Sequence, residues 1–328
     1  AADAAYNYGY QYDLIGNRLH ENRGQLDLNS TYNPLNQLTY LDWGGKLDVL
    51  GITTSTGDIV KVAGQAAQMF GTNYLGGAKV GPGSNAIPVV AWNGTNSTQT
   101  NRTVYMPPVK PQKFLYDLNG NITNDEQRAF FWDEENRLVT IESLVGEKRK
   151  SEYVYDAQWR RTQKKDLSGL SGSGYSTTNI TRFVWDNWLL ISDITDTPTL
   201  PYSVTNYYVW GLDLSQSLQG AGGIGGLLAS IRAPPQTNNW LFAFDGNGNV
   251  ANVSDDSGVK VASFNYDPFG RLISFSGSQA DSIPWKLSTK YSEPWWNLMY
   301  YGYRYCAPRQ NLASLAGWES PSGKDGQP

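Results

Sequence analysis

Residues 113–138 read KFLYDLNGNITNDEQRAFFWDEENRL, and this stretch decides the fold because it contains nearly the same phrase twice. In each copy an aromatic residue precedes an aspartate, Gly or Asn follows three positions after the aspartate, and an aliphatic residue follows five positions after it. An aspartate side chain can accept backbone N–H groups two residues later, and Gly or Asn tolerates a positive φ. Each copy therefore predicts a tight turn between two strands.

The phrase recurs along the chain, which favours a structural repeat over a catalytic carboxylate pair. The residues that we assign to it are Tyr12, Asp13 and Gly16; Tyr116, Asp117 and Gly120; Trp132 and Asp133; Tyr155 and Asp156; Trp185 and Asp186; Phe244, Asp245 and Gly248; and Tyr266, Asp267 and Gly270. Copies about twenty residues apart fit two short strands and two turns. One hairpin cannot bury its own apolar face, so neighbouring copies must stack into an extended sheet.

The composition also predicts an all-β protein. The chain has 21 Tyr, 12 Trp and 34 Gly, and only 17% of its residues are charged. Aromatic residues suit a pleated, half-buried surface, and glycine suits tight turns. A net charge of −4 gives no electrostatic reason to expect a nucleic-acid partner. No apolar run approaches the ~18 residues that a membrane-spanning helix needs.

Residues 46–112 interrupt the repeat, and Val, Ile, Thr and Gly replace the aromatic-Asp phrase there. Ala63-Gly64 predicts a hairpin turn, and the alternation across residues 83–92 predicts a half-buried strand in which Pro88 indicates an edge or a bulge. We expect an inserted immunoglobulin-like sandwich of about six strands. The predicted divisions are a first ribbon at 1–45, the insert at 46–112, a second ribbon at 113–305 and a divergent tail at 306–328.

Catalytic and metal-binding roles are not predicted. The repeat aspartates are spread one per hairpin, whereas calcium needs six to eight converging oxygens. His20 is the single histidine and Cys306 the single cysteine, which argues against a multi-histidine metal site. We therefore expect no catalytic residue, no metal ligand and no cofactor. Trp295 and Trp296 are candidates for stacking on a sugar ring, with packing between hairpins as the alternative.

The repeats resemble the YD-repeat proteins of the Rhs (rearrangement hotspot) class, related to the shell subunits of bacterial insecticidal toxin complexes and to teneurins. The resemblance covers roughly residues 6–44 and 113–305, and its most specific parts are SFNYDPFGRLISFSG at 263–277 and LSTKYSEPWWNLMYYGYRY at 287–305. The core-motif residues at the family spacing are Tyr291, Tyr301, Gly302, Tyr303 and Arg304. The insert resembles the sandwich module named after a domain of glucodextranase.

The resemblance implies a β-sheet ribbon that spirals into a shell around a polypeptide payload. The expected fold is thus an all-β, spiralling hairpin ribbon forming a partial shell or barrel, with the sandwich inserted. Expected partners are the chain's own payload domain, other copies, or other parts of a larger Rhs protein. The implied location is extracellular, secreted or on a bacterial cell surface.

Many members of the class carry an Asp-Pro motif after the core that cuts the payload free. This sequence departs from that pattern after Tyr305, where Pro308 is kept but Gly317 and Trp318 stand at the Asp-Pro positions. We expect self-cleavage to be lost and the tail to be a degenerate or frame-shifted end.

Three functions stay open at this point. The first is a non-enzymatic shell segment, either the C-terminal turns and plug of a larger shell or a unit that assembles with copies of itself. The second is a surface binding or assembly protein, an adhesin or fibre subunit with carbohydrate as its candidate ligand. The third is a self-cleaving aspartyl core.

Overall fold

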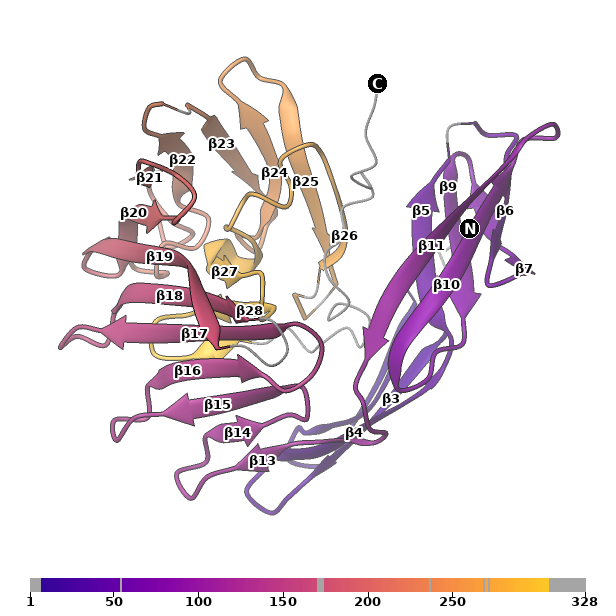
Figure 1. Cartoon of the computed structure of the whole chain (residues 1–328), viewed down its shortest axis with the longest axis horizontal. Helices are drawn as coiled ribbons and strands as arrows, with labels where there is room; N and C mark the ends of the chain where they lie inside the picture. The colour runs from indigo at the N-terminus through magenta and orange to yellow at the C-terminus, as the bar shows by residue number, and fades with distance from the viewer. Residues whose placement is uncertain are drawn as a thin grey trace. The chain divides into compact units, whose positions relative to one another are not determined.

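The computed structural model describes residues 7–53, 55–169, 174–235, 237–267, 269–270 and 272–306. Their regular structure is β throughout, apart from one 3-10 turn at Leu287–Thr289 (Figure 1), which confirms the predicted class. No helix in these residues is long and apolar enough to cross a membrane. The tail after Cys306, with Pro308, Gly317 and Trp318, lies outside the described residues. The chain divides into two compact units at Gln127/Arg128.

The first unit begins with a sheet of antiparallel hairpins. Its strands are β1 (Tyr8–Tyr12), β2 (Arg18–Arg23), β3 (Leu26–Tyr32), β4 (Leu38–Gly45) and β12 (Gln112–Lys113), in the order β1-β2-β3-β4-β12. Gln112 lies opposite Leu41, and Lys113 lies opposite Tyr40. The ladder therefore passes directly from the residues before the insert to those after it. A further hairpin follows, formed by β13 (Leu115–Tyr116) and β14 (Ile122–Asn124).

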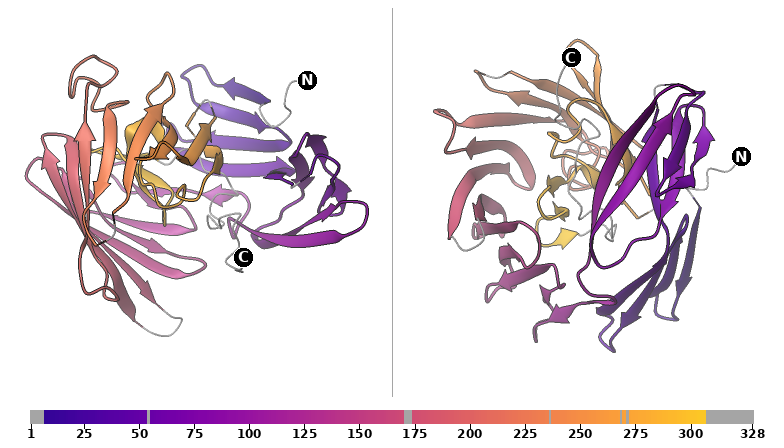
Figure 2. Two further views of the ribbon diagram at one scale, coloured as in Figure 1. Left: turned by 90° about the horizontal axis from the view of Figure 1, so that it is seen from above. Right: turned by 45° about the vertical axis from the view of Figure 1, so that its right-hand side comes forward.

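The inserted segment is a sandwich of two small sheets. One sheet has the order β11-β10-β6-β7 and the other β5-β9-β8. The strands are β5 (Leu47–Ile52), β6 (Ile59–Val62), β7 (Gln65–Ala66), β8 (Gln68–Phe70), β9 (Asn73–Ala78), β10 (Gly83–Trp92) and β11 (Ser97–Met106), and Figure 2 draws the long β10–β11 hairpin from two further directions. A Cβ on Gly76 would lie 2.4 Å from Val62, so glycine is what lets the sheets approach there.

Two sequence predictions for the insert have different outcomes. Ala63 and Gly64 join β6 to β7 with φ values of 48° and 79°, which confirms the predicted turn. The bulge predicted at Pro88 is wrong, because the pairing of β10 with β11 shows no shift in register, whereas the predicted edge holds locally: β10 is an inner strand only over the residues that pair with β6. Proline fits because β6 pairs only with Val89–Trp92, so Pro88 lies just beyond that ladder.

In the second unit, strands β15 to β26 pair antiparallel in chain order into one large sheet. The strands are β15 (Arg128–Trp132), β16 (Leu138–Ser143), β17 (Lys148–Tyr155), β18 (Arg161–Gly169), β19 (Tyr175–Asp186), β20 (Leu189–Asp196), β21 (Val204–Trp210), β22 (Leu227–Arg232), β23 (Asn239–Phe244), β24 (Val250–Asp255), β25 (Lys260–Tyr266) and β26 (Leu272–Ser276). The sheet curls, and Figure 1 shows one of its faces turned toward β27 (Tyr291–Glu293) and β28 (Leu298–Tyr300).

The inner face of this sheet is covered by residues 279–306, which we call the inner segment. It contains the 3-10 turn, β27, β28 and β29 (Tyr305–Cys306). The Trp285 ring packs edge-on against Tyr208, Trp210 and Tyr291, with centroids 4.9, 5.4 and 5.5 Å away. These residues belong to the main apolar core of the unit, so the chain's own residues fill the inner side of the sheet there instead of leaving it hollow.

Candidate functional site

The repeat aspartates cap the turns of the hairpins. Asp13 Oδ1 accepts the backbone N–H groups of Ile15 at 3.1 Å and Asn17 at 2.7 Å, and Asn17 Nδ2 donates to Asp13 Oδ2 at 2.8 Å. The Asn121 side chain and nearby backbone N–H groups hold the pKa of Asp117 below its usual value. Comparable capping bonds are made by Asp117, Asp133, Asp156, Asp245 and Asp267. Gly16, Gly120, Gly248 and Gly270 all have positive φ.

Two copies of the phrase differ from the prediction. Asp186 lies inside the β19–β20 ladder opposite Leu189, so the turn there is only two residues long and Asn187 takes the positive φ of 48°. The aspartate-capped turn predicted at Asp186 is therefore wrong, because the structure has a two-residue turn at this place. Asp255, which the sequence analysis left out, accepts the N–H groups of Ser257 at 3.0 Å and Val259 at 2.9 Å.

Four of the repeat aromatics link their hairpin to an earlier strand through a polar tip. Tyr116 Oη donates to the carbonyl of Leu38 at 2.8 Å, and Tyr155 Oη to that of Leu138 at 2.7 Å. Trp185 Nε1 donates to the Arg161 carbonyl at 2.7 Å, and Tyr266 Oη to the Val250 carbonyl at 3.0 Å. Tyr12, Trp132 and Phe244 also end their strands. Because Tyr and Trp have a donor at the end of a large ring, they satisfy a carbonyl that phenylalanine could not.

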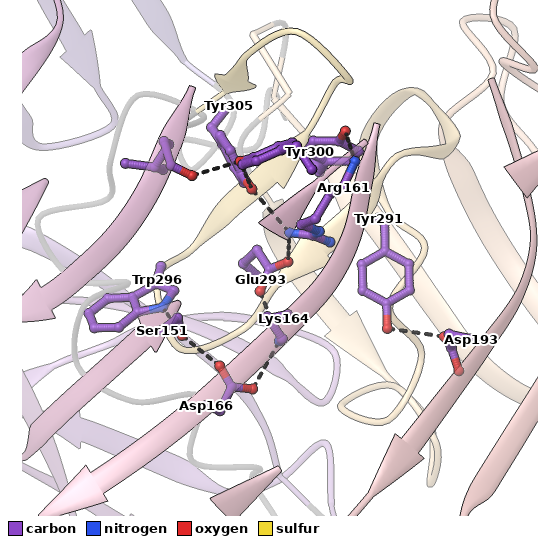
Figure 3. Close-up of polar contacts among 12 residues, drawn as sticks. Ser151, Arg161, Lys164, Asp166, Asp193, Tyr291, Glu293, Trp296, Tyr300 and Tyr305 are labelled. Atoms are coloured by element: carbon purple, nitrogen blue, oxygen red, sulfur yellow. Dashed lines mark hydrogen bonds and ion pairs between the residues drawn. The ribbon is translucent and has the colours of Figure 1, made fainter. Parts of the chain in front are cut away.

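A cluster of four charges, of which Arg161, Asp166 and Glu293 are buried and Lys164 is half-buried, fastens β18 to the inner segment (Figure 3). We call Arg161, Lys164, Asp166 and Glu293 the buried charge cluster. Arg161 is 0% exposed, Glu293 is 1% exposed, and the two form an ion pair. Lys164 Nζ lies 2.9 Å from Glu293 Oε2 and 3.0 Å from Asp166 Oδ2. Two positive and two negative groups balance, which is what allows charges to persist at this depth.

Aromatic rings surround the Arg161 guanidinium. Its central carbon lies 4.5 Å from the ring centroids of both Phe183 and Tyr300. The backbone N–H of Arg161 donates to Tyr300 Oη at 2.8 Å, and Nη1 donates to Tyr305 Oη at 3.2 Å. Burial alone would raise the pKa of Glu293, but the Arg161 and Lys164 charges outweigh it and hold that pKa below its usual value. Glu293 is therefore ionised at neutral pH.

Trp296 belongs to the same buried network and is not a surface for sugar stacking. It is 2% exposed, and its Nε1 donates to Ser151 Oγ at 2.7 Å. Ser151 Oγ in turn donates to Asp166 Oδ1 at 2.5 Å. The glycan-stacking role suggested for Trp296 is thus wrong, because its ring is buried and its Nε1 donates to Ser151 on β17. Trp295 is half-buried, with the Arg149 guanidinium 5.1 Å from its ring.

A polar cavity of about 280 Å³ adjoins the cluster, lined by residues that include Lys164, Asp193, Arg232, Trp240 and Trp295. Asp193 is 1% exposed and accepts hydrogen bonds from Tyr208 Oη at 2.5 Å and Tyr291 Oη at 3.1 Å. Burial raises the pKa of Asp193, although these donors oppose the shift. Tyr291, a predicted core-motif residue, thereby ties β27 to β20.

The other core-motif residues shape the turn between β28 and β29. The Tyr301 N–H donates to the Arg304 carbonyl at 2.9 Å, and Gly302 has a φ of 82°. The Tyr303 ring is 66% exposed and lies 4.7 Å from the ring of Trp188. Arg304 is exposed, so the turn positions it at the surface.

The glycine-rich stretch at 220–226 binds the inner segment. Lys290 Nζ donates to the Gly222 carbonyl at 2.7 Å, and the Gly225 N–H donates to Thr289 Oγ1 at 2.8 Å. Thr289 Oγ1 also donates to the Gly248 carbonyl at 2.7 Å. Residues 220–226 therefore have a structural role, which is to contact the inner segment.

Lys286 is buried within the inner segment. Its Nζ donates to the carbonyls of Ala280 at 2.8 Å and Ile283 at 2.6 Å, and it lies 3.9 Å from the centroid of the Phe264 ring. Burial lowers the pKa of Lys286 to about 7.

No local sequence pattern marks the residues that hold the inner segment in place, which are Arg161, Lys164, Asp166, Asp193 and Glu293. The position of Lys164 and Asp166 becomes clear only from the strand register. Lys164 lies opposite Tyr153, and Asp166 lies opposite Ser151, on the aromatic face of the sheet. In the described ranges, no group of three or more His, Cys, Asp or Glu side chains could hold a metal ion. Chemically, the arrangement pairs charges and fixes a segment.

Comparison with known proteins finds partial similarity. No protein-family model matches the chain. It is 26% identical over 163 residues to the tRNA3(Ser)-specific nuclease WapA of Bacillus spizizenii, covering 49% of this chain and 6% of the relative. It is 24% identical over 162 residues to the tRNA nuclease WapA of Bacillus subtilis strain 168, with the same coverage of 49% and 6%. The chain thus spans a small part of the curated relatives that it matches.

Solved structures of similar chain path were also found. The TcdB2-TccC3-TEV crystal structure matches 92% of this chain and 15% of its own, with 14% identity and a TM-score of 0.47. The TcdB2-TccC3 crystal structure matches 94% of this chain and 17% of its own, with 16% identity and a TM-score of 0.46.

Proposed function

We propose that this chain is a non-enzymatic segment of an Rhs-class, YD-repeat shell that encloses or presents a polypeptide payload. In this proposal the second unit is a closed end of the ribbon, and the inner segment is its plug. The observation that carries the proposal is the buried charge cluster. It commits two cations and two anions, three of them buried and Lys164 half-buried, to fastening residues 279–306 onto the inner face of the sheet.

A plug fastened by charges suits containment better than catalysis. Each carboxylate of the cluster is engaged by a cation, and Asp193 is engaged by two tyrosine hydroxyls. A general base or nucleophile needs a partly accessible, unengaged group. Buried ion pairs cost desolvation energy and are retained in some proteins for the specificity of the arrangement that they fix. A single fixed position of the inner segment on the sheet would be an arrangement of this kind.

The proposal assigns roles to other parts of a longer polypeptide. The WapA relatives are tRNA nucleases, and the matched region is 6% of their length. We therefore place any nuclease activity outside residues 7–306, in a payload carried by the same polypeptide. The partners are that payload and further YD-repeat segments, and the location is extracellular or on the cell surface.

The test is protection of a payload from protease. The complete polypeptide that contains this chain is digested with proteinase K, and the surviving fragments are identified by mass spectrometry. We expect the segments beyond residue 306 to survive in the wild type and to be digested in Glu293→Gln, which loosens the plug. Glu152→Gln, which alters an exposed ion pair on β17, is the matched control and should protect like the wild type. Digestion of those segments in the wild type, while residues 128–306 stay intact, would refute the proposal.

A further inference from the structure

The sandwich of the first unit has an open side between two edge strands. β11 is the last strand of one sheet, and β5 is the last strand of the other. A pocket of about 290 Å³ lies at this end of the sandwich, lined by residues that include Thr98, Thr100 and Arg102 of β11, together with Tyr74 and Ala91. Thr98 pairs with Ala91 and Thr100 with the core residue Val89, so these β11 side chains share the inner face of their sheet.

Several of the residues at the pocket have short side chains or none. Gly51 of β5 has no side chain, and the Tyr74 hydroxyl occupies the space where a Cβ would lie, 2.3 Å away. Ala91, Thr98 and Thr100 are short, whereas Val60, Val62 and Ile87 fill the core elsewhere. The result is an apolar floor of Val89, Ala91 and Tyr74 that opens at the side of the sandwich.

Residues 97–101 of the β11 edge lack the charges, prolines and bulges that usually block strand addition. β10 and β11 pair from Gly83↔Met106 to Trp92↔Ser97 without a shift in register, so the edge is long and regular. Residues 97–101 are exposed and contain neither lysine nor proline. Natural sheets protect such edges with charges, proline, bulges or covering segments. An exposed, regular edge of this kind is a template for an added strand.

One charge beside the pocket selects the partner. Arg102 is half-buried on the pocket side of β11, and in the part of the chain that the structure describes it makes no ion pair. The other charged lining residue, Asp58, is 8% exposed and accepts the backbone N–H of Ser55 at 3.2 Å. The accessible charge is therefore positive, and it complements a carboxylate.

We propose that the β11 edge binds an extended peptide strand, with an apolar side chain in the pocket and an acidic side chain two residues away against Arg102. Residues i and i+2 of a strand project to the same face, so both side chains of the added strand reach the side on which Thr100 and Arg102 lie. Backbone hydrogen bonds to β11 supply affinity, and the pocket and Arg102 supply selectivity. This site is separate from the inner segment and does not depend on the proposed shell function.

The test uses a fluorescein-labelled peptide of sequence Thr-Val-Thr-Leu-Thr-Glu-Thr-Val and fluorescence anisotropy with the whole chain. Thr100→Lys places a charge in the pocket and should weaken binding by roughly tenfold or more. Gln99→Thr is the control, because Gln99 pairs with Val90 and projects to the opposite face, and threonine adds no charge to the edge. It should change binding by less than about twofold. Thermal unfolding of both variants checks that the sandwich remains folded.

Two further measurements distinguish the peptide from other occupants. Arg102→Met should weaken binding of the Glu peptide but not of a Gln peptide, and N-methylation of alternate peptide nitrogens should abolish binding through lost backbone hydrogen bonds. Equal loss in Gln99→Thr and Thr100→Lys, or undiminished binding of N-methylated peptides in both alternations, would overturn the proposal. So would the absence of binding to the unmodified peptide at ~1 mM, a range in which weak complexes are detectable. Binding of cellohexaose that Thr100→Lys abolishes, without peptide binding, would identify a sugar pocket instead.

Discussion

Replacing Glu293 with glutamine should weaken the attachment of the inner segment to the sheet, although the two side chains have almost the same shape. The wild-type cluster holds two positive and two negative groups, and the variant holds two positive groups and Asp166 alone, a net charge of +1. Removing one partner of a buried ion pair costs ~3–5 kcal/mol, because the remaining charge stays desolvated. For a unit of this size that corresponds to a fall in the midpoint of thermal unfolding of roughly 6–20 °C.

The assay is denaturant unfolding monitored by the hydrogen exchange of peptides from residues 279–306. The exchange of these peptides reports on the second unit alone. The control is Glu152→Gln, whose carboxylate is 39% exposed and lies 3.0 Å from Lys150 Nζ. An exposed pair of that kind is worth ~0–1 kcal/mol. The double variant Arg161→Met/Glu293→Gln leaves Lys164 and Asp166 as a balanced pair. It should therefore lose less stability than the sum of its two single variants, by ~0.5–3 kcal/mol.

The same residue gives the second unit a defined acid response. The pKa of Glu293 in the folded protein is below its ordinary value, so its contribution to stability is present above the unfolded pKa and is lost as pH falls through the folded one. Wild type should lose more stability on acidification than Glu293→Gln. If Glu293→Gln costs no more than Glu152→Gln, or if the two proteins show parallel acid profiles, the cluster does not hold the segment and the reasoning fails.

Three further predictions concern other parts of the fold. Because burial lowers the pKa of Lys286 to about 7, the unfolded chain binds more protons above that pH, and wild-type stability should rise relative to Lys286→Met between pH 7 and 9 by up to ~1.4 kcal/mol per unit. Urea titrations at three pH values measure this, and parallel profiles would contradict it. Asp156→Ala removes the acceptor for the Gln158 and Arg160 N–H groups and should cost ~1–2 kcal/mol in denaturant unfolding, whereas Asp186→Ala, outside such a cap, should cost less than ~0.5 kcal/mol. Equal costs for the two would show that the cap contributes nothing. Tyr155→Phe deletes the donor to the Leu138 carbonyl and should cost ~1 kcal/mol in the same assay, so a phenylalanine variant as stable as wild type would contradict the role given to the hydroxyl.

The parts of the fold that the sequence could predict are those set by neighbouring residues. The turn at Asp117 needs an acceptor, donors within four residues and a residue that tolerates positive φ, and all three are adjacent in the chain. The Ala63-Gly64 turn is local in the same sense. The copy at Asp186 could not be separated from the others, because its turn length depends on how β19 and β20 pair.

The candidate site depends on contacts that no local pattern contains. Arg161 and Glu293 are separated by 132 positions, and Trp296 and Ser151 by 145. The sugar-stacking prediction for Trp296 fails for this reason. A tryptophan in a polar stretch of sequence gives no sign that it will be buried against a distant strand. The core motif at 287–305 marked the inner segment as important, but its role depends on partners in β18 and β20 that only the curled sheet brings near.

The pairing of β12 with β4 has a consequence for how such a chain can change over time. Since Gln112 and Lys113 face Leu41 and Tyr40, the ends of the inserted sandwich lie at the place where an ordinary hairpin loop would close. A gene segment added or removed at that point leaves the hydrogen bonds of the ribbon in register on both sides. The ribbon can thus exchange one accessory module for another, and acquire or discard a binding specificity, without altering its own strand pairing.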